Sequence, residues 1–320
     1  METANKLELH YYFNDNSHTM DALIRNKCEA ELLALINEVK NSLGFDFSLD
    51  AEALREGGLV NKWKALGENQ AQIQIILTII LIIIGLATLY QSKDDEIDIE
   101  LKKLDREEKL LNIEKLKREL AEGNTNGKTV KETAISINND FKVLTRKSNL
   151  YKQLDSYEKI TQLGINALTI DDKPIQPEKI ILKADFYKYI LTTNDLPVEV
   201  VEDAEIEIIS PVLREGKYKW KGIYQDEPIS FHMADTEFKN DVLSKKVSFQ
   251  HGTIIQCVLK ICRELDETGE IVVKAVNGYT VNTVISKIDD EKISETSQGK
   301  RYKLTKKFIE GQEELFKPQE

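Results

Sequence analysis

The sequence predicts an α+β multidomain membrane protein with a small, mainly helical N-terminal module, one transmembrane helix continuing into a helical stalk, and a β-rich C-terminal domain. Three patterns predict this class. Residues 69–92 contain no charged side chain, although 31% of the chain is charged. Apolar residues then recur at three- and four-residue steps, as in an amphipathic helix. Residues 128–320 contain alternating runs typical of strands. The predicted domains are 1–70, 71–91, 92–123 and 128–320.

The composition excludes several classes of protein. The chain has 320 residues and a net charge of −11, whereas general nucleic-acid binders are usually basic. Six prolines and 15 glycines are too few for a collagen-like or low-complexity chain. The three cysteines, Cys28, Cys257 and Cys262, do not form a disulfide framework, so a reducing compartment is expected.

The N-terminal module, residues 1–70, begins with a strand-like run from Leu7 to Phe13. Apolar residues at helical spacing follow between Met20 and Leu43. A module of this length makes only a marginal hydrophobic core. We therefore expect it to need the membrane, a second copy or another partner.

The uncharged segment is long enough to cross a bilayer, because a helix of about 20 residues spans a hydrocarbon core of about 30 Å. Seven of the ten residues at 75–84 are isoleucine. Trp63 and Tyr90 flank the segment, as interfacial aromatic residues do. The alternative is a helix buried in a large protein core or in an oligomer.

The few small and polar residues of this segment share one helical face. They follow steps of four and three residues and are Gln74, Thr78, Leu81, Gly85 and Thr88. In lipid, such a face is where helices pack together or where water enters. It therefore predicts a packing seam between copies or the lumen of an oligomeric ring, and both require self-association.

The segments beyond the apolar run predict a stalk and then a β-rich domain. Residues 92–123 form an amphipathic pattern, which Glu108 interrupts, so a short bundle is expected rather than a long coiled coil. Residues 129–154 have a helical pattern, and 234–246 predicts a short helix between strands. The remaining runs predict antiparallel strands.

One basic cluster lies near the end of the β-rich domain. Its members are Lys300, Arg301, Lys303, Lys306 and Lys307. Such a run is usually a solvated helix face. The functional alternative is contact with anionic phosphates of lipid headgroups or of nucleic acid.

No pattern of catalytic, metal-ligating or cofactor-binding residues emerges. The four histidines lack further ligands at metal-site spacing, and no phosphate-binding or nucleophile motif occurs. The acidic run from Glu199 to Glu207 suits a solvated strand face, with a divalent-ion site as the alternative. We therefore expect no enzyme activity, no metal and no cofactor.

Two stretches and the uncharged span resemble uncharacterised bacterial membrane proteins of similar layout. The stretches are HYYFNDNSHTMDALIRNKCEAELLALINEV and YKWKGIYQDEPISFHMADTEFKNDVLSKKVSFQHGT. This layout is similar to that of membrane effectors of antiviral defence systems, including those accompanying short prokaryotic Argonautes. The resemblance implies a toxin effector of abortive infection that damages the inner membrane when a cytoplasmic sensor or an Argonaute-type complex triggers it.

These patterns together predict a non-enzymatic, single-pass effector of the bacterial inner membrane that self-associates and permeabilises or depolarises the bilayer. Its expected partners are the bilayer, including anionic lipids, and further copies of itself, without sequence-specific nucleic-acid binding. More basic residues follow the span than precede it, which favours a cytoplasmic C-terminal domain. The alternatives are a passive membrane-anchored adaptor with a C-terminal binding domain and an enzyme whose site is assembled from distant loops.

Overall fold

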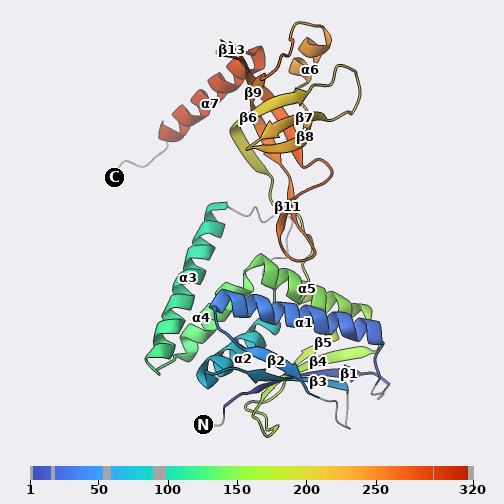
Figure 1. The fold of residues 1–320 in the computed structure, drawn as a ribbon, viewed down its shortest axis with the longest axis vertical. Coiled ribbons are helices and arrows are strands. Elements are labelled where there is room, and N and C mark those ends of the chain that lie inside the picture. Colours follow the sequence, from blue (N-terminus) through green and yellow to red (C-terminus); the bar gives the residue numbers. More distant parts are fainter. Residues whose placement is uncertain (1–2, 16–18, 53–58, 89–98, 291, 316–320) are drawn as a thin grey trace. The chain divides into compact units, whose positions relative to one another are not determined.

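The computed structural model describes residues 3–15, 19–52, 59–88, 99–290 and 292–315 (Figure 1). The chain divides into two compact units. The first comprises Met1–Asn194 and Leu265–Glu270, and the second comprises Asp195–Glu264 and Ile271–Glu320. Each unit combines helices with β-strands, so the chain has an α+β fold.

The first unit contains a sheet of five antiparallel strands. In spatial order they are β2 (Ser48–Ala51), β3 (Leu59–Leu66), β1 (Lys6–Phe13), β4 (Ile160–Leu168) and β5 (Lys179–Leu182). β1 is central, because Leu7 pairs with Trp63 on one side and with Ala167 on the other. One sheet therefore combines strands from both ends of the first unit.

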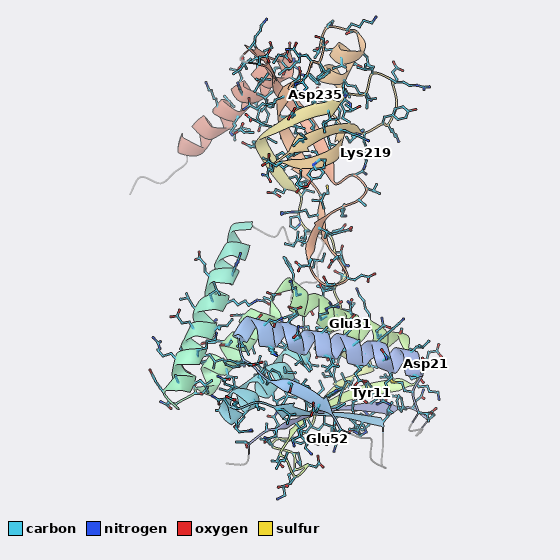
Figure 2. All side chains as sticks on the ribbon, viewed as in Figure 1. Tyr11, Asp21, Glu31, Glu52, Lys219 and Asp235 are labelled. Atoms are coloured by element: carbon cyan, nitrogen blue, oxygen red, sulfur yellow. The ribbon has the colours of Figure 1, made fainter. Side chains whose placement is uncertain are left out.

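Helices accompany this sheet in the first unit, and some of them pack on one another rather than on the sheet (Figure 1). They are α1 (Ala22–Leu43), α2 (Gln70–Ile84), α3 (Ile99–Ala121), α4 (Gly127–Asn138), α5 (Phe141–Ser156) and a 3-10 helix at Lys183–Tyr189. Asp21 is the N-cap of α1, and its carboxylate accepts hydrogen bonds from the amides of Leu23 and Ile24 (Figure 2). α1 and α5 lie side by side, and Arg146 of α5 pairs with Glu31 of α1 at 3.3 Å.

The uncharged segment forms α2 inside this core. Ile76, Leu77, Ile79 and other residues all round the helix are buried, and its neighbours are α4, β4 and α1. A helix that is apolar on every side is stable where protein surrounds it. The alternative of a helix buried in a protein core therefore describes this segment.

The predicted transmembrane helix is wrong. α2 has 15 residues and rises about 22 Å, which is less than the ~30 Å of a hydrocarbon core. Among the described residues, no helix combines the length and the apolar character that crossing a membrane requires. This finding corrects the predicted α+β membrane protein, its single-pass inner-membrane location, the membrane-permeabilising effector and the membrane-anchored adaptor.

α3 occupies the region of the predicted stalk. It packs along α4, and its side chains Ile113 and Leu116 are buried there. Asn112 of α3 also donates a hydrogen bond to the Ser136 hydroxyl of α4 at 2.8 Å. The apolar spacing of this helix therefore serves packing within the first unit.

The second unit is built from eight strands and two helices among its described residues. They are β6 (Glu199–Ser210), β7 (Trp220–Tyr224), β8 (Glu227–Met233), α6 (Thr236–Leu243), β9 (Ile254–Ile261), β10 (Arg263–Leu265), β11 (Ile271–Val273), β12 (Tyr279–Asp289), β13 (Lys292–Glu295) and α7 (Ser297–Leu315). Five strands close on themselves in the order β6, β7, β8, β12, β9 and back to β6. Only the β8–β12 pair among these five is parallel. This Greek-key order, with a helix between the third and fourth strands, is that of an OB-fold.

Buried aromatic and polar contacts fix this arrangement. Trp220 and Phe231 are fully buried between the strands, with ring centroids 6.2 Å apart. Asp235 is also buried, and its carboxylate accepts hydrogen bonds from the amides of Phe238 at 2.9 Å and Val284 at 2.8 Å (Figure 2). One carboxylate therefore caps α6 and holds it against β12.

Candidate functional site

The loop between β6 and β7 carries the strongest candidate site. Its side chains Arg214, Lys217 and Lys219 are exposed, and Tyr218 is 53% exposed (Figure 2 labels Lys219). Lys221 continues the basic run on β7. Residues 211–221 contain four basic residues and one acidic residue, which gives a local charge of +3 in a chain whose net charge is −11.

The outer face of β7 and β8 extends this site. Strand alternation turns Trp220 and Phe231 inward, so Lys221 and Ser230 lie outward and pair directly across the two strands. His232 follows Ser230 on the same face at the next outward position. The face therefore presents one cation, one hydroxyl and one imidazole beside the loop.

Two hydrogen bonds tether the loop to its own unit. Nζ of Lys239 in α6 donates to the carbonyl of Gly216 at 2.9 Å, and Nζ of Lys219 donates to the carbonyl of Ala275 at 3.3 Å. Gly216 has φ +139°, and a Cβ there would lie 2.7 Å from the Tyr218 ring. Glycine at this position therefore allows the ring to lie over the loop backbone.

The loop cations are available to an anionic ligand. Within the described part of the chain, no carboxylate forms an ion pair with Arg214, Lys217 or Lys221. Positive charge beside an exposed aromatic ring suits a ligand that carries both phosphates and planar rings.

An acidic groove of 470 Å³ lies along β6 and the end of β7. Four carboxylates line it, those of Asp203, Glu205, Glu207 and Asp226. No group of His, Cys, Asp and Glu side chains in the described ranges is arranged to hold a metal ion. The groove therefore supplies negative potential to one part of the second unit, in contrast to the basic loop.

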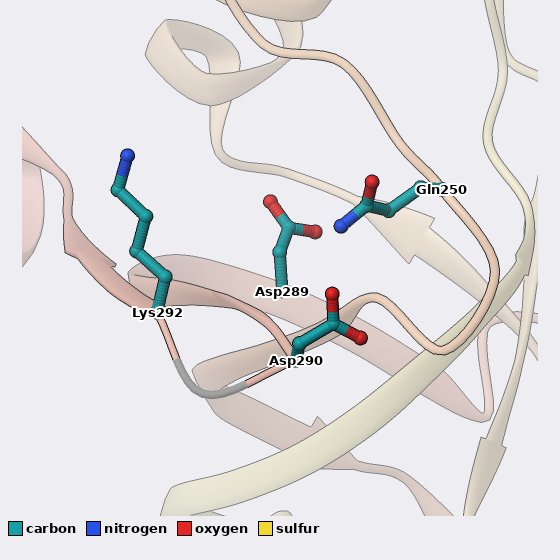
Figure 3. Close-up of a pocket in the computed structure, with 4 residues that line it drawn as sticks. All are labelled: Gln250, Asp289, Asp290 and Lys292. Atoms are coloured by element: carbon teal, nitrogen blue, oxygen red, sulfur yellow. The ribbon is translucent and has the colours of Figure 1, made fainter.

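A shallow hollow of 690 Å³ is lined by Gln250, Asp289, Asp290 and Lys292 (Figure 3). The Asp289 carboxylate accepts hydrogen bonds from the Thr253 hydroxyl at 2.6 Å and from Nζ of Lys287 at 2.5 Å. Burial acts to raise the pKa of Asp289, but these hydrogen bonds outweigh it and lower that pKa. Both oxygens of this carboxylate have partners within the unit, so it is a structural group.

The first unit carries a polar cluster on its sheet. The Tyr12 hydroxyl donates to Glu178 at 2.7 Å, and Nδ1 of His10 lies 3.6 Å from the same carboxylate. Burial, followed by the contact with Glu178, raises the pKa of Tyr12 to about 12. A Cβ at Gly164 would lie 2.0 Å from the carboxylate, so this glycine provides its place.

The residues predicted to face a membrane pore or packing seam lie in or just beyond α2. Gln74, Thr78 and Leu81 are in the helix, Gly85 is its C-cap, and Thr88 follows it. Leu81 and Thr88 are buried, and the Thr78 hydroxyl donates to the carbonyl of Gln74 at 2.8 Å. Three of the five residues therefore lie in α2, and the other two lie at or beyond its C-terminal end.

The two predicted interfacial aromatic residues have different outcomes. Trp63 is buried in β3, opposite Leu7. Tyr90 lies outside the described residues. Trp63 therefore contributes to the hydrophobic core.

The predicted basic cluster lies on α7. Three of its members form ion pairs within the second unit: Arg301 with Glu237, Lys303 with Glu295, and Lys306 with Glu202. Lys300 and Lys307 are exposed. Three of the five members therefore have carboxylate partners on β6, α6 and β13 of the same unit.

The basic loop has a signal in the sequence, because KYKWK at 217–221 alternates cations with aromatic residues. The acidic balance of the whole chain obscures this signal, since the balance averages a basic loop with an acidic groove. No family model, curated protein or solved structure matches the chain.

Proposed function

We propose that the second unit binds single-stranded nucleic acid across the β6–β7 loop and the outer face of β7 and β8. The observation that carries this proposal is the exposed Tyr218 ring among four cationic side chains. They lie at the loop and strand pair that OB-folds use for oligonucleotides. A fold does not determine a function, and these side chains supply the chemistry that binding requires.

Each part of the site has a chemical role in this proposal. The four basic side chains of residues 211–221 neutralise phosphates, and the Tyr218 ring stacks on one base. The Ser230 hydroxyl and the His232 ring supply hydrogen bonds to sugar or base. Stacking and phosphate contacts tolerate any base, so binding is largely independent of sequence.

The number of cations at the site sets how strongly the affinity should depend on salt concentration. Four cations that each neutralise one phosphate of a single strand give a slope of about −3 in log affinity against log salt. Duplex DNA offers no unstacked base to Tyr218, so it binds more weakly than a single strand of the same length.

Fluorescence anisotropy with a labelled mixed-sequence 12-nucleotide strand tests the proposal. Tyr218→Ala should weaken binding about tenfold and leave the salt slope unchanged, because it removes stacking alone. Lys217→Ala with Lys221→Ala should reduce the slope to about half. The matched control is Lys260→Ala, an exposed lysine on β9.

Two results contradict the proposal. One is the absence of binding by the wild-type chain at 50 mM salt. The other is an equal loss of affinity in the Lys260→Ala control and in the loop variants, because this would place the contact outside the loop.

A further inference from the structure

α7 presents an apolar stripe to solvent. Leu304 and Phe308 lie one helical turn apart and are 69% and 67% exposed. The helix packs on β12 near its beginning, where Gly299 lies against Ile285. A helix on a globular unit normally buries its apolar stripe. Among the described residues, this stripe lacks a partner.

α3 of the first unit presents a second exposed apolar surface. Leu110 and Leu111 are 60% and 65% exposed, whereas Ile113 and Leu116 of the same helix are buried on α4. α3 therefore has one apolar side that is covered and another that is open.

The net charges beside these two surfaces have opposite signs, because three glutamates within one turn of Leu110 and Leu111 on α3 outnumber the two basic residues there, Arg106 and Lys115, besides Lys109, which pairs with Asp140 of the same unit. On α7, Lys300 and Lys307 lie within one turn of Leu304, and both are exposed. On α3, Glu107 and Glu114 lie within one turn of Leu110 and Leu111, and both are exposed. In the described ranges, none of these four charged groups has an ion-pair partner.

We propose that the chain self-associates, with α7 of one copy packing against α3 of a second copy. The two apolar surfaces cover each other, and the lysines of α7 face the glutamates of α3. Pairing α7 with α7 would oppose lysines, and pairing α3 with α3 would oppose glutamates, so like charges disfavour both. An anionic lipid surface would suit α7 but would leave α3 open.

Charge exchange tests this pairing. The first variant is Lys300→Glu with Lys307→Glu, and the second is Glu107→Lys with Glu114→Lys. Each variant alone should self-associate at least about tenfold more weakly than the wild type, because its α3 and α7 then carry like charges. An equal mixture of the two variants should restore association, because each α7 again meets an oppositely charged α3.

Sedimentation velocity across a micromolar concentration series measures the association, and circular dichroism checks that the exposed substitutions leave the fold intact. A wild-type chain that stays monomeric overturns the proposal. A mixture no stronger than its components also overturns it. The proposal is also overturned if the wild type binds vesicles of anionic lipid and its chains do not associate with one another.

Discussion

Lys147 tests how the first unit accommodates a cation in its core. Its side chain is fully buried in α5, and burial lowers its pKa from 10.5 to about 7. Its Nζ donates to the carbonyl of Leu86 at 2.8 Å and to Oδ1 of Asn138. We predict that Lys147→Met removes a large pH dependence from the stability of this unit.

The stability of the first unit should rise with pH, because its folded and unfolded states bind different numbers of protons. The unfolded chain keeps the Lys147 proton up to about pH 10.5, whereas the folded chain releases it near pH 7. Between these values the unfolded state binds more protons, so stability rises by up to about 1.4 kcal/mol per pH unit. From pH 7 to pH 10 the gain is roughly 3 to 4 kcal/mol. The lost hydrogen bonds lower the variant's stability by about 2 kcal/mol at every pH, without a slope.

Urea unfolding followed by tryptophan fluorescence measures this effect. The chain has two tryptophans, so Trp220→Phe leaves the buried Trp63 as a reporter of the first unit. In that background, Lys147→Met is compared with its parent from pH 7 to pH 10. Other titrating groups are common to both proteins and cancel in the difference. Lys131→Met, at an exposed position of α4, is the matched control.

The stability difference between parent and Lys147→Met should change by roughly 3 to 4 kcal/mol over this range, while the Lys131→Met difference stays constant. Parallel curves for the parent and Lys147→Met would refute the assignment of a buried, weakly basic amine at this position.

Three further predictions concern packing and polar contacts. Gly222→Ala should destabilise the second unit by about 2 kcal/mol, because the new Cβ lies 2.5 Å from Cγ2 of Ile206 and 2.6 Å from the carbonyl oxygen of Glu207. An unchanged urea midpoint, followed by Trp220 fluorescence, would contradict this prediction. Lys6→Met should lower the free energy of unfolding of the first unit by about 3 kcal/mol, because Nζ of Lys6 lies 2.8 Å from the Glu52 carboxylate and 2.9 Å from the Asp172 carboxylate. A decrease below about 0.5 kcal/mol, measured by urea unfolding, would refute this prediction. Glu178→Gln should lower the pKa of Tyr12 from about 12, because the Glu178 carboxylate, which accepts a hydrogen bond from Tyr12, is one cause of the raised pKa. Carbon NMR of the tyrosine rings measures this pKa. An unchanged value would show that burial alone raises it.

The uncharged segment shows that a sequence pattern alone does not distinguish a helix in lipid from a helix in a protein core. Apolar residues all round a helix fit both lipid and a protein core, and the sequence does not show which one surrounds it. The deciding contacts come from distant residues: Tyr151 donates to the carbonyl of Ile84 at 2.8 Å, and Lys147 donates to that of Leu86. Polar groups more than 60 positions away thus satisfy the end of α2.

Local elements were easier to predict than their pairing. The expected strand at Leu7–Phe13, the expected helix ending near Leu43 and the short helix within 234–246 are confirmed. β3 has clear alternation, with Leu59, Trp63 and Ala65 buried, but the place of Trp63 beside the uncharged segment also fits an interfacial aromatic residue. The β1–β4 register joins Leu7 to Ala167, and no local pattern specifies such a distant pair.

The candidate site was harder to predict because it depends on which strands become neighbours. Alternation alone gives the outward positions of Lys221 and Ser230 once β7 and β8 are known. Their position beside Tyr218, at the edge where we propose that single-stranded nucleic acid binds, depends on the closed order of five strands. That order includes the parallel β8–β12 pair, which brings together residues about 50 positions apart.

Chemical-shift mapping by NMR tests the proposed function most directly. The isotope-labelled chain is titrated with an unlabelled single-stranded oligonucleotide at low salt. We predict that the shifted amides cluster at residues 214–221 and 230–232. Shifts concentrated on the acidic groove around Asp203 and Asp226, or no shifts at all, would contradict binding at the basic loop.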